Sequence, residues 1–324
     1  MTPLDRVRTG VALLLWAGAS LLNGKEPAKA APAAAEFVAP IELIHDKPYV
    51  MVMVNGRGPY RFLLDTGTGT EALISPELVQ ELGIPKVGHA RLKDMSGVGE
   101  QRSDVVWVES IKIGSIEFDD VQAVEHRLFR EEQNCQGVLG FPLFENYLLT
   151  LDYPGRKLIL SSGTLEQHAG GSIVPLRVTD GVPIVMISIA GHSVDAQIDS
   201  GGTGLSLPDA LAEQIRFQSA PVEYGIAESL TTRYSLKAAR LQPDVRFGPY
   251  VFRKAFVEIN SAFPVVNVGS TPLKNLVLTF DQQEGLMSVY GKDRIMSLDA
   301  SPVLMQMQSE PPRQASDARL VPVG

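Results

Sequence analysis

Short apolar runs alternate with turn residues from Phe37 to about Leu160, and the same alternation returns in the second half of the chain. Apolar runs of this length, bounded by Gly, Pro, Asn and Asp, are typical of strands and hairpins. The run Tyr49–Val54 ends at Asn55-Gly56, which is a strong hairpin turn when it lies between two such runs. A similar pair of runs occupies Ile184–Ile198. The pattern therefore predicts an all-β protein.

Each half also contains one segment that predicts a short helix. Ser75 is a suitable N-cap, Pro76 suits the first helical position, and Gly83 suits the end of the helix. In the second half, Pro208 predicts the start of a helix that continues to Ile215. These few short helices leave the all-β class unchanged.

The two halves repeat each other. An Asp-Thr/Ser-Gly motif follows an apolar run at Asp65-Thr66-Gly67 and again at Asp199-Ser200-Gly201, 134 positions later (199 − 65). Further along, Leu149–Asp152 and Leu278–Asp281 also match, now 129 positions apart (281 − 152). Solenoid repeats have units of roughly 20–50 residues. The long period instead indicates a duplicated domain.

The repeat divides the chain into four parts. We expect a signal peptide and spacer at 1–35, a first β lobe at 36–165, a second β lobe at 166–292, and a disordered or loosely attached tail at 293–324. The length of 324 residues suits two domains of about 100–200 residues each. The polar segment 161–172 is the expected hinge between the lobes.

The N-terminus has the features of a targeting segment. Arg6 and Arg8 precede the thirteen-residue apolar stretch Gly10–Leu22, whereas a membrane-spanning helix needs about 20 residues. Small-residue cleavage sites follow at Ala28–Ala30 and Ala33–Ala35. We expect a periplasmic or secreted protein without stable membrane association after cleavage. An uncleaved anchor and a cytosolic protein are the alternatives.

Composition excludes several kinds of partner and site. The net charge of −8 and the isoelectric point near 5.2 argue against nucleic acid, which requires a basic face. The single cysteine, Cys135, excludes an internal disulfide and is expected to be a buried thiol. The five histidines are scattered without an i, i+4 pair, so we expect no metal site and no cofactor. Gly67–Ala72 matches a dinucleotide-binding pattern, but no alternating strand–helix pattern follows.

The duplicated motif indicates acid–base chemistry. Two neighbouring carboxyl groups cannot both ionise easily, so one keeps a proton while the other acts as a base toward water. Thr66 and Ser200 are expected to bind the backbone of each other's turn across the interface. Gly67 and Gly201 permit the sharp bends after the carboxyl groups. A single Asp-x-Gly is ordinarily only a turn, but its duplication after apolar strands favours Asp65 and Asp199 as a catalytic pair.

Between about Tyr49 and Gly291 the chain resembles the pepsin-like and retropepsin-like aspartic proteases, especially bacterial aspartyl protease-like proteins. The resemblance rests on four segments: Phe62–Thr68, Ile198–Gly201, Gly137–Gly140, and Leu151–Tyr153 with Lys157–Leu160. It implies a bilobal, mostly β fold with few short helices and the two aspartates in a central cleft. It also implies a monomeric aspartic endopeptidase that acts on peptide or protein substrates.

The resemblance implies further site residues. Gly97, Val98 and Gly99 would form the tip of a flap that contacts substrate, and the Thr68 hydroxyl would bind the first carboxylate. Gly202 occupies the equivalent second position and has no hydroxyl. Because the loss of a donor raises a carboxyl pKa, we expect an activity optimum near about pH 5–6 rather than below about pH 3.5.

Two details of the second half agree less closely with the family pattern. Asn267-Val268-Gly269 matches the apolar-apolar-Gly segment less well than Val138-Leu139-Gly140 does. The flap tyrosine of pepsins has no match near Gly97, and Tyr224-Gly225-Ile226 occupies the stretch of the second half that corresponds to the flap, where it would either touch substrate or only pack. The alternative function is a catalytically silent periplasmic peptide-binding or scaffold protein with the same fold. Gly202 is the sequence feature that favours this alternative. A half-length protein that acts only as a dimer is disfavoured because one chain contains both motifs.

Overall fold

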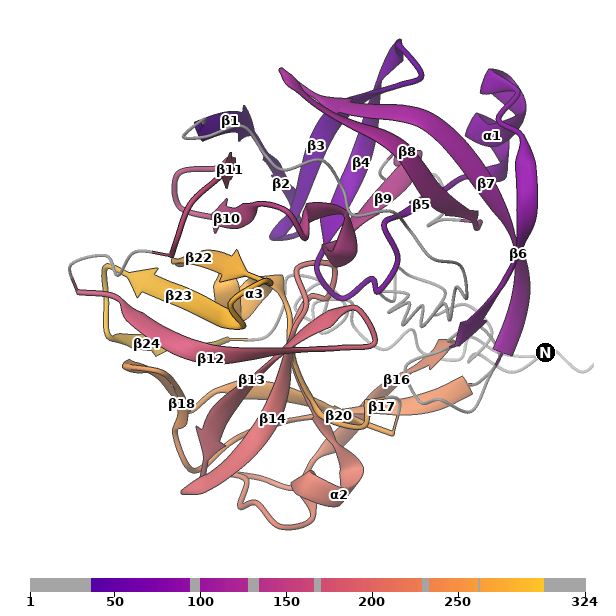
Figure 1. Cartoon of the computed structure of the whole chain (residues 1–324). Coiled ribbons are helices and arrows are strands. Elements are labelled where there is room, and N and C mark those ends of the chain that lie inside the picture. Colours follow the sequence, from indigo (N-terminus) through magenta and orange to yellow (C-terminus); the bar gives the residue numbers. More distant parts are fainter. Residues whose placement is uncertain are drawn as a thin grey trace, which may run out of the picture.

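The computed structural model describes residues 36–93, 100–127, 134–165, 170–228, 233–261 and 263–299 of the chain. Strands dominate the described residues, and they form two sheets with a few short helices (Figure 1). The all-β class, the two similar lobes and the scarcity of helix are confirmed. No helix among the described residues is long and apolar enough to cross a membrane. The apolar stretch 10–22 lies outside them.

The first lobe is an eight-stranded sheet with the order β2-β3-β4-β9-β5-β8-β7-β6. Its helix α1 (Pro76–Leu82) and 3₁₀-helix η2 (Phe141–Phe144) follow β5 and β9 in sequence. The strands are β2 (Glu42–Ile44), β3 (Lys47–Val54), β4 (Arg57–Asp65), β5 (Ala72–Ile74), β6 (Lys86–Lys93), β7 (Glu100–Ile113), β8 (Ile116–Glu125) and β9 (Gly137–Gly140).

The second lobe repeats this arrangement in the lower half of Figure 1 and carries the short helices α2 (Asp209–Ala212) and α3 (Ser270–Leu273). Its strands are β13 (Val182–Ile189), β14 (His192–Ile198), β15 (Leu205–Pro208), β16 (Val222–Glu228), β17 (Arg233–Arg240), β18 (Val245–Phe247), β19 (Tyr250–Arg253), β20 (Phe256–Asn260), β21 (Val266–Val268) and β24 (Ile295–Ser297). In the first lobe β4 pairs with β9, β9 with β5, and β5 with β8. The strands β14, β21, β15 and β20 pair in the same order and directions.

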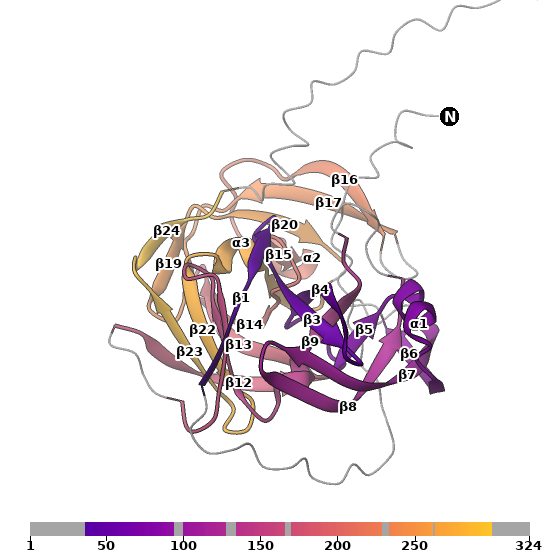
Figure 2. The same cartoon turned by 90° about the horizontal axis from the view of Figure 1, so that it is seen from above.

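Six strands drawn from both halves connect the lobes, in the order β1-β11-β10-β22-β23-β12, and Figure 2 shows them from above. They are β1 (Glu36–Pro40), β11 (Lys157–Ser161), β10 (Leu148–Asp152), β22 (Leu276–Asp281), β23 (Leu286–Gly291) and β12 (Ser172–Thr179). At their centre Thr150 lies opposite Thr279, and the two hydroxyl oxygens are 2.8 Å apart. These are equivalent residues of the repeat. The approximate twofold relation between the halves therefore passes through this pair.

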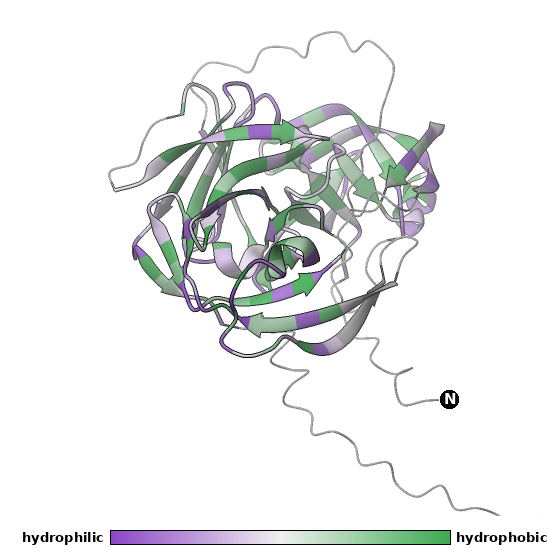
Figure 3. Cartoon of the chain, turned by 90° about the horizontal axis from the view of Figure 1, so that it is seen from below, coloured by the Kyte–Doolittle hydropathy of each residue, from purple (hydrophilic) through white to green (hydrophobic). Residues whose placement is uncertain are grey.

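Equivalent strands of the two lobes bury the same positions. β3 and β13 have the same order of buried and exposed positions, with Met51 and Met186 as the exposed residue of each strand. The first four residues of each strand are buried, so both faces of the strand are covered there, because successive side chains point to opposite faces. Figure 3 shows hydrophobic and hydrophilic residues following one another along the strands.

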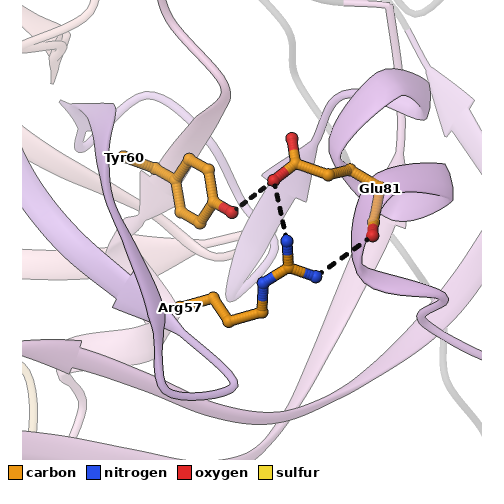
Figure 4. Close-up of polar contacts among 3 residues, drawn as sticks. All are labelled: Arg57, Tyr60 and Glu81. Atoms are coloured by element: carbon orange, nitrogen blue, oxygen red, sulfur yellow. Dashed lines mark hydrogen bonds and ion pairs between the residues drawn. The ribbon is translucent and has the colours of Figure 1, made fainter.

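Helix α1 forms where the capping residues predict it. Leu78 N donates to the Ser75 hydroxyl over 3.2 Å, and Gly83 ends the helix with a φ of 65°. Glu81 of α1 accepts hydrogen bonds from Tyr60 (2.7 Å) and Arg57 (3.5 Å) of β4, as Figure 4 shows. These exposed contacts orient the helix on the sheet and add little stability.

The end of the second helix and the start of the tail differ from the positions that the sequence predicts. The second helix spans only Asp209–Ala212, and the chain continues to Ile215 in tighter turns whose amides bond carbonyls three residues back. The expectation of a loose tail from residue 293 is wrong at its start. Ile295–Ser297 forms β24 against β19, and Met296 and Leu298 are buried, because apolar side chains return there after the polar stretch. Residues 300–324 lie outside the described residues.

Candidate active site

Asp65 and Asp199 meet where the two lobes join. Asp65 ends β4 and Asp199 follows β14, so equivalent strands of the repeat position them. Both are buried, and their carboxyl groups are hydrogen-bonded to each other. A Cβ atom built on Gly201 would lie 2.2 Å from the Asp65 carboxyl carbon, and one on Gly67 would lie 2.6 Å from Asp199 Oδ1. Each turn therefore requires glycine because the opposite carboxyl group lies against its backbone.

Thr66 and Ser200 bind the two turns to each other, as the sequence predicts. Thr66 N donates to the Ser200 hydroxyl (2.9 Å), and Ser200 N donates to the Thr66 hydroxyl (3.0 Å). The Thr66 hydroxyl donates to the Ile198 carbonyl (2.6 Å), and the Ser200 hydroxyl donates to the Leu64 carbonyl (2.8 Å). All four bonds are buried and cross between the lobes. They hold the two aspartates in one relative position.

Asp65 accepts two hydrogen bonds from its own loop. Gly67 N donates to Oδ1 (2.8 Å) and the Thr68 hydroxyl donates to Oδ2 (2.9 Å). Donors aimed at a carboxylate stabilise its ionised form. The arrangement agrees with the role that the family resemblance implies for Thr68.

Asp199 has a matching pair of donors, which corrects the expectation for Gly202. Gly202 N donates to Asp199 Oδ1 (2.8 Å), and Asn267 Nδ2 donates to Oδ2 (2.8 Å). The amide of Asn267 in β21 thus takes the place of the absent hydroxyl. A Cβ on Gly202 would lie 2.7 Å from Asp199 Oδ2 and 2.9 Å from Asn267 Nδ2, so a threonine there has no room.

Sequence reasoning missed the role of Asn267, although a signal was present. Asn267 stands 129 positions after Val138 (267 − 138), where the family pattern has an apolar residue. An amide in a buried apolar position is costly unless it has a hydrogen-bond partner. That partner is the Asp199 carboxyl group.

The electrostatic surroundings favour one shared proton. Burial is the largest cause that raises the pKa of Asp199, and the charge of Asp65 is the second. The bonds from Asn267 and Gly202 oppose this rise. The pair therefore resists double ionisation and shares one proton.

Two buried groups next to the pair were not anticipated. Lys47 of β3 is buried, and burial lowers its pKa while the charges of Asp199 and Asp65 oppose that change. Ser270 at the start of α3 donates from its hydroxyl to the Ser200 carbonyl (2.6 Å) and lies 3.2 Å from the Tyr153 hydroxyl. Lys47 places an amine near the carboxyl groups, whereas Ser270 supports the second loop.

The remaining expected site residues have different outcomes. Gly97, Val98 and Gly99 lie outside the described residues, between β6 and β7. Tyr224 of β16 is half-buried, and its hydroxyl is hydrogen-bonded to Glu258 of β20.

The structure also bears on the cysteine and on side chains that could bind a metal. Cys135 is half-buried rather than fully buried, because its thiol lies at the edge of the first lobe's core and donates to the Gly137 carbonyl (3.0 Å). No group of three or more metal-ligating side chains occurs among the described residues.

The match to a protein-family model agrees with this site. Residues 50–143 match the family model described as aspartyl protease, and this segment contains Asp65 through Thr68. The resemblance predicted from the sequence is thereby confirmed. No curated protein matches the chain in sequence. Basic 7S globulin from soybean is a similar solved structure, with 12% identity, a TM-score of 0.47, and coverage of 79% of this chain and 95% of that chain.

Proposed function

We propose that this aspartyl protease-like chain is an aspartic endopeptidase that hydrolyses peptide bonds with water activated by Asp65 and Asp199. The observation that carries the proposal is the matched set of donors around two buried carboxyl groups. Four inter-lobe hydrogen bonds hold these groups in place. A pair of structural turns would not require this arrangement.

The geometry suggests a role for each carboxyl group. Asp65 is the base that removes a proton from a water molecule, and Asp199 holds the proton that polarises the substrate carbonyl. The water oxygen forms a bond to the carbonyl carbon, and the carbon–nitrogen bond then breaks as the leaving nitrogen takes a proton. Both carboxyl groups lie in surroundings with little water, which strengthens their interaction with the developing charge.

The substrate is an extended segment of peptide or protein lying along the junction between the lobes. We further propose that the protein acts as a monomer after export to the periplasm or beyond. The apolar stretch Gly10–Leu22 and the small residues after it support export. Retention of the apolar stretch on the purified protein would argue against cleavage.

The alternative, a catalytically silent peptide-binding protein, loses its main support. It was favoured by the absence of a hydroxyl at Gly202, and Asn267 supplies an equivalent donor to Asp199. We therefore retain the alternative only as an outcome of the experiment.

The test is cleavage of an unfolded protein by the purified chain from about pH 3 to pH 7, with and without a statine-type inhibitor. Asp65→Asn and Asp199→Asn should each abolish cleavage while the chain remains folded by circular dichroism. Asp195→Asn is the matched control, because Asp195 lies on β14, the strand that directly precedes Asp199, and pairs with Arg177 at the surface. It should retain activity. Absence of cleavage by the folded chain at every pH would refute the proposal and favour the binding protein.

A further inference from the structure

The first lobe has a row of apolar residues across four neighbouring strands. Leu63 of β4 lies opposite Val138 of β9, which lies opposite Leu73 of β5, which lies opposite Val124 of β8. All four are buried and belong to one small hydrophobic cluster. Residues paired across neighbouring strands point to the same face of a sheet. We call these four residues the apolar row.

The second lobe has polar residues at all four equivalent positions. Gln197 of β14 lies opposite Asn267 of β21, which lies opposite Ser206 of β15, which lies opposite Glu258 of β20. Gln197, Ser206 and Asn267 are at most 5% exposed, and Glu258 is half-buried. We call these four residues the polar row.

The replacement of apolar by polar residues is confined to the four strands of the row. The next residues outward are Tyr49 and Val105 in the first lobe, and Ile184 and Ala238 in the second. Both ends are therefore without charge, and three of these four residues are fully apolar. Burying the three inner side chains, Gln197, Asn267 and Ser206, costs free energy unless they have hydrogen-bond partners, and Asn267 has one in Asp199. The polar row thus replaces part of a hydrophobic cluster with hydrogen-bonding groups.

The polar row begins at the catalytic aspartates and leads away from them. Asn267 donates to Asp199, and Gln197 Nε2 lies 3.0 Å from a Cβ built on Gly67. At the far end, Glu258 Oε1 lies 2.7 Å from a Cβ built on Gly204, in the loop that follows Asp199. Glu258 is the least buried member. A substrate bound at the aspartates would therefore meet the Glu258 end of the row.

Glu258 lies among groups that a cationic ligand would contact. Lys47 acts electrostatically on Glu258 and on both aspartates, and burial lowers the pKa of Lys47. The Tyr224 hydroxyl is hydrogen-bonded to Glu258, and Tyr224 is also half-buried. An incoming cation would place positive charge beside the Glu258 carboxylate.

We propose that Glu258 and Tyr224 form a subsite for a cationic substrate side chain, that of lysine or arginine. The proposal rests on the proposed protease function and specifies its substrate class. The ammonium or guanidinium group contacts the Glu258 carboxylate, and the aliphatic part of the side chain lies along Tyr224. At the equivalent place in the first lobe, Val124 offers only apolar contact.

The subsite has its own pH dependence. Burial raises the pKa of Glu258 to about 7, and the Tyr224 hydrogen bond and the charge of Lys47 oppose the rise. Glu258 therefore becomes charged as the pH rises through about 7, and only the charged form attracts a cation strongly. Preference for lysine should increase with pH over this range. The ratio of kcat/KM for two peptides cleaved by one enzyme cancels the titration of the aspartates, which both substrates share.

The experiment compares peptides that carry Lys or Met at each position on either side of the cleaved bond, using the full chain. Lysine should be preferred about 10- to 100-fold at a single position, as expected for a charge-assisted hydrogen bond in a partly dry site. Glu258→Gln should remove the preference and its pH dependence, and Glu258→Val should reverse it toward Met. Glu223→Gln, which removes an exposed carboxylate on β16 next to Tyr224 in sequence, is the matched control and should change neither.

Several outcomes would overturn the subsite. The absence of a lysine preference at every position would do so, as would a preference that persists in Glu258→Gln. Each ratio is measured within one variant, so partial unfolding of a variant does not affect it. If the wild-type chain cleaves no peptide, the protease function fails separately. Fluorescence anisotropy of the Lys and Met peptides then tests the subsite directly, and equal affinities would refute it.

Discussion

Replacement of Asn267 by leucine tests the arrangement of donors around the aspartates. The side chains are similar in size, but leucine cannot donate to Asp199 Oδ2, which the amide reaches over 2.8 Å. Asn267 and Asp199 are both essentially inaccessible to solvent, so water cannot replace the donor. Asn267 Oδ1 has no hydrogen-bond partner among the described residues. Removing this oxygen therefore leaves no donor without a partner.

The expected magnitude follows from the type of bond that is lost. A hydrogen bond to a charged group contributes about 1.5–3 kcal/mol, and about 1.4 kcal/mol corresponds to one pKa unit. Loss of the donor should therefore raise the pKa of Asp199 further. Because we propose that Asp199 holds the shared proton, the alkaline limb of the kcat/KM profile should move to higher pH. The acid limb should change little.

Thr68→Val provides the complementary measurement. It removes the hydroxyl donor to Asp65 and should instead move the acid limb to higher pH. Asn275→Ala changes an exposed asparagine and should move neither limb. An unchanged profile in Asn267→Leu would refute the reasoning about the donor. A shift of its acid limb would show that the proton is assigned to the wrong aspartate.

Four further predictions concern the residues around the pair. Gly202→Thr should destabilise the chain by about 1–3 kcal/mol and reduce kcat/KM rather than improve it, because its Cβ meets Asp199 and the amide that already serves it; unchanged thermal unfolding would contradict this. Lys47→Met should move the alkaline limb of the pH profile upward, since positive charge near Asp199 opposes the rise in its pKa; a downward shift would exclude this role. Thr150→Val should cost about 1–2 kcal/mol in urea unfolding by leaving the Thr279 hydroxyl unpaired, and the double valine variant should cost less than the sum of the single variants. Asp199→Asn should become more stable relative to the wild type as the pH rises. The folded-state pKa of Asp199 lies above its unfolded value, so the contribution of Asp199 to wild-type stability is lost as the pH rises through the folded pKa. A difference in unfolding free energy between the two proteins that does not vary with pH would contradict this.

Local sequence patterns predicted most of the fold. Short apolar runs bounded by turn residues identified the strands, and Ser75 with Gly83 marked the ends of α1, because both signals act within a few residues. The start of the tail was predicted wrongly because a three-residue strand such as Ile295–Ser297 has too short a pattern to recognise. Its formation depends on its partner strand β19.

The period of the repeat also relates distant residues that contact each other. The offset of 134 relates Thr66 to Ser200, whose contact the sequence predicted, and the offset of 129 relates Thr150 to Thr279, whose contact only the structure shows. Equivalent residues of two halves meet when they lie on the twofold axis that relates the halves. The period of a duplicated sequence therefore indicates which residue pairs are candidates for contact across the axis.

The sequence by itself determined the strands, the duplication and the two Asp-x-Gly turns, since each depends on short segments or on the comparison of one half with the other. Only the tertiary structure decided which donor serves Asp199, why Gly202 must remain glycine, and that Gln197, Ser206 and Glu258 form a row with Asn267. These facts depend on which strands become neighbours. The free energy of a buried polar group is set by the partner that the fold brings to it, and residue type alone does not identify that partner.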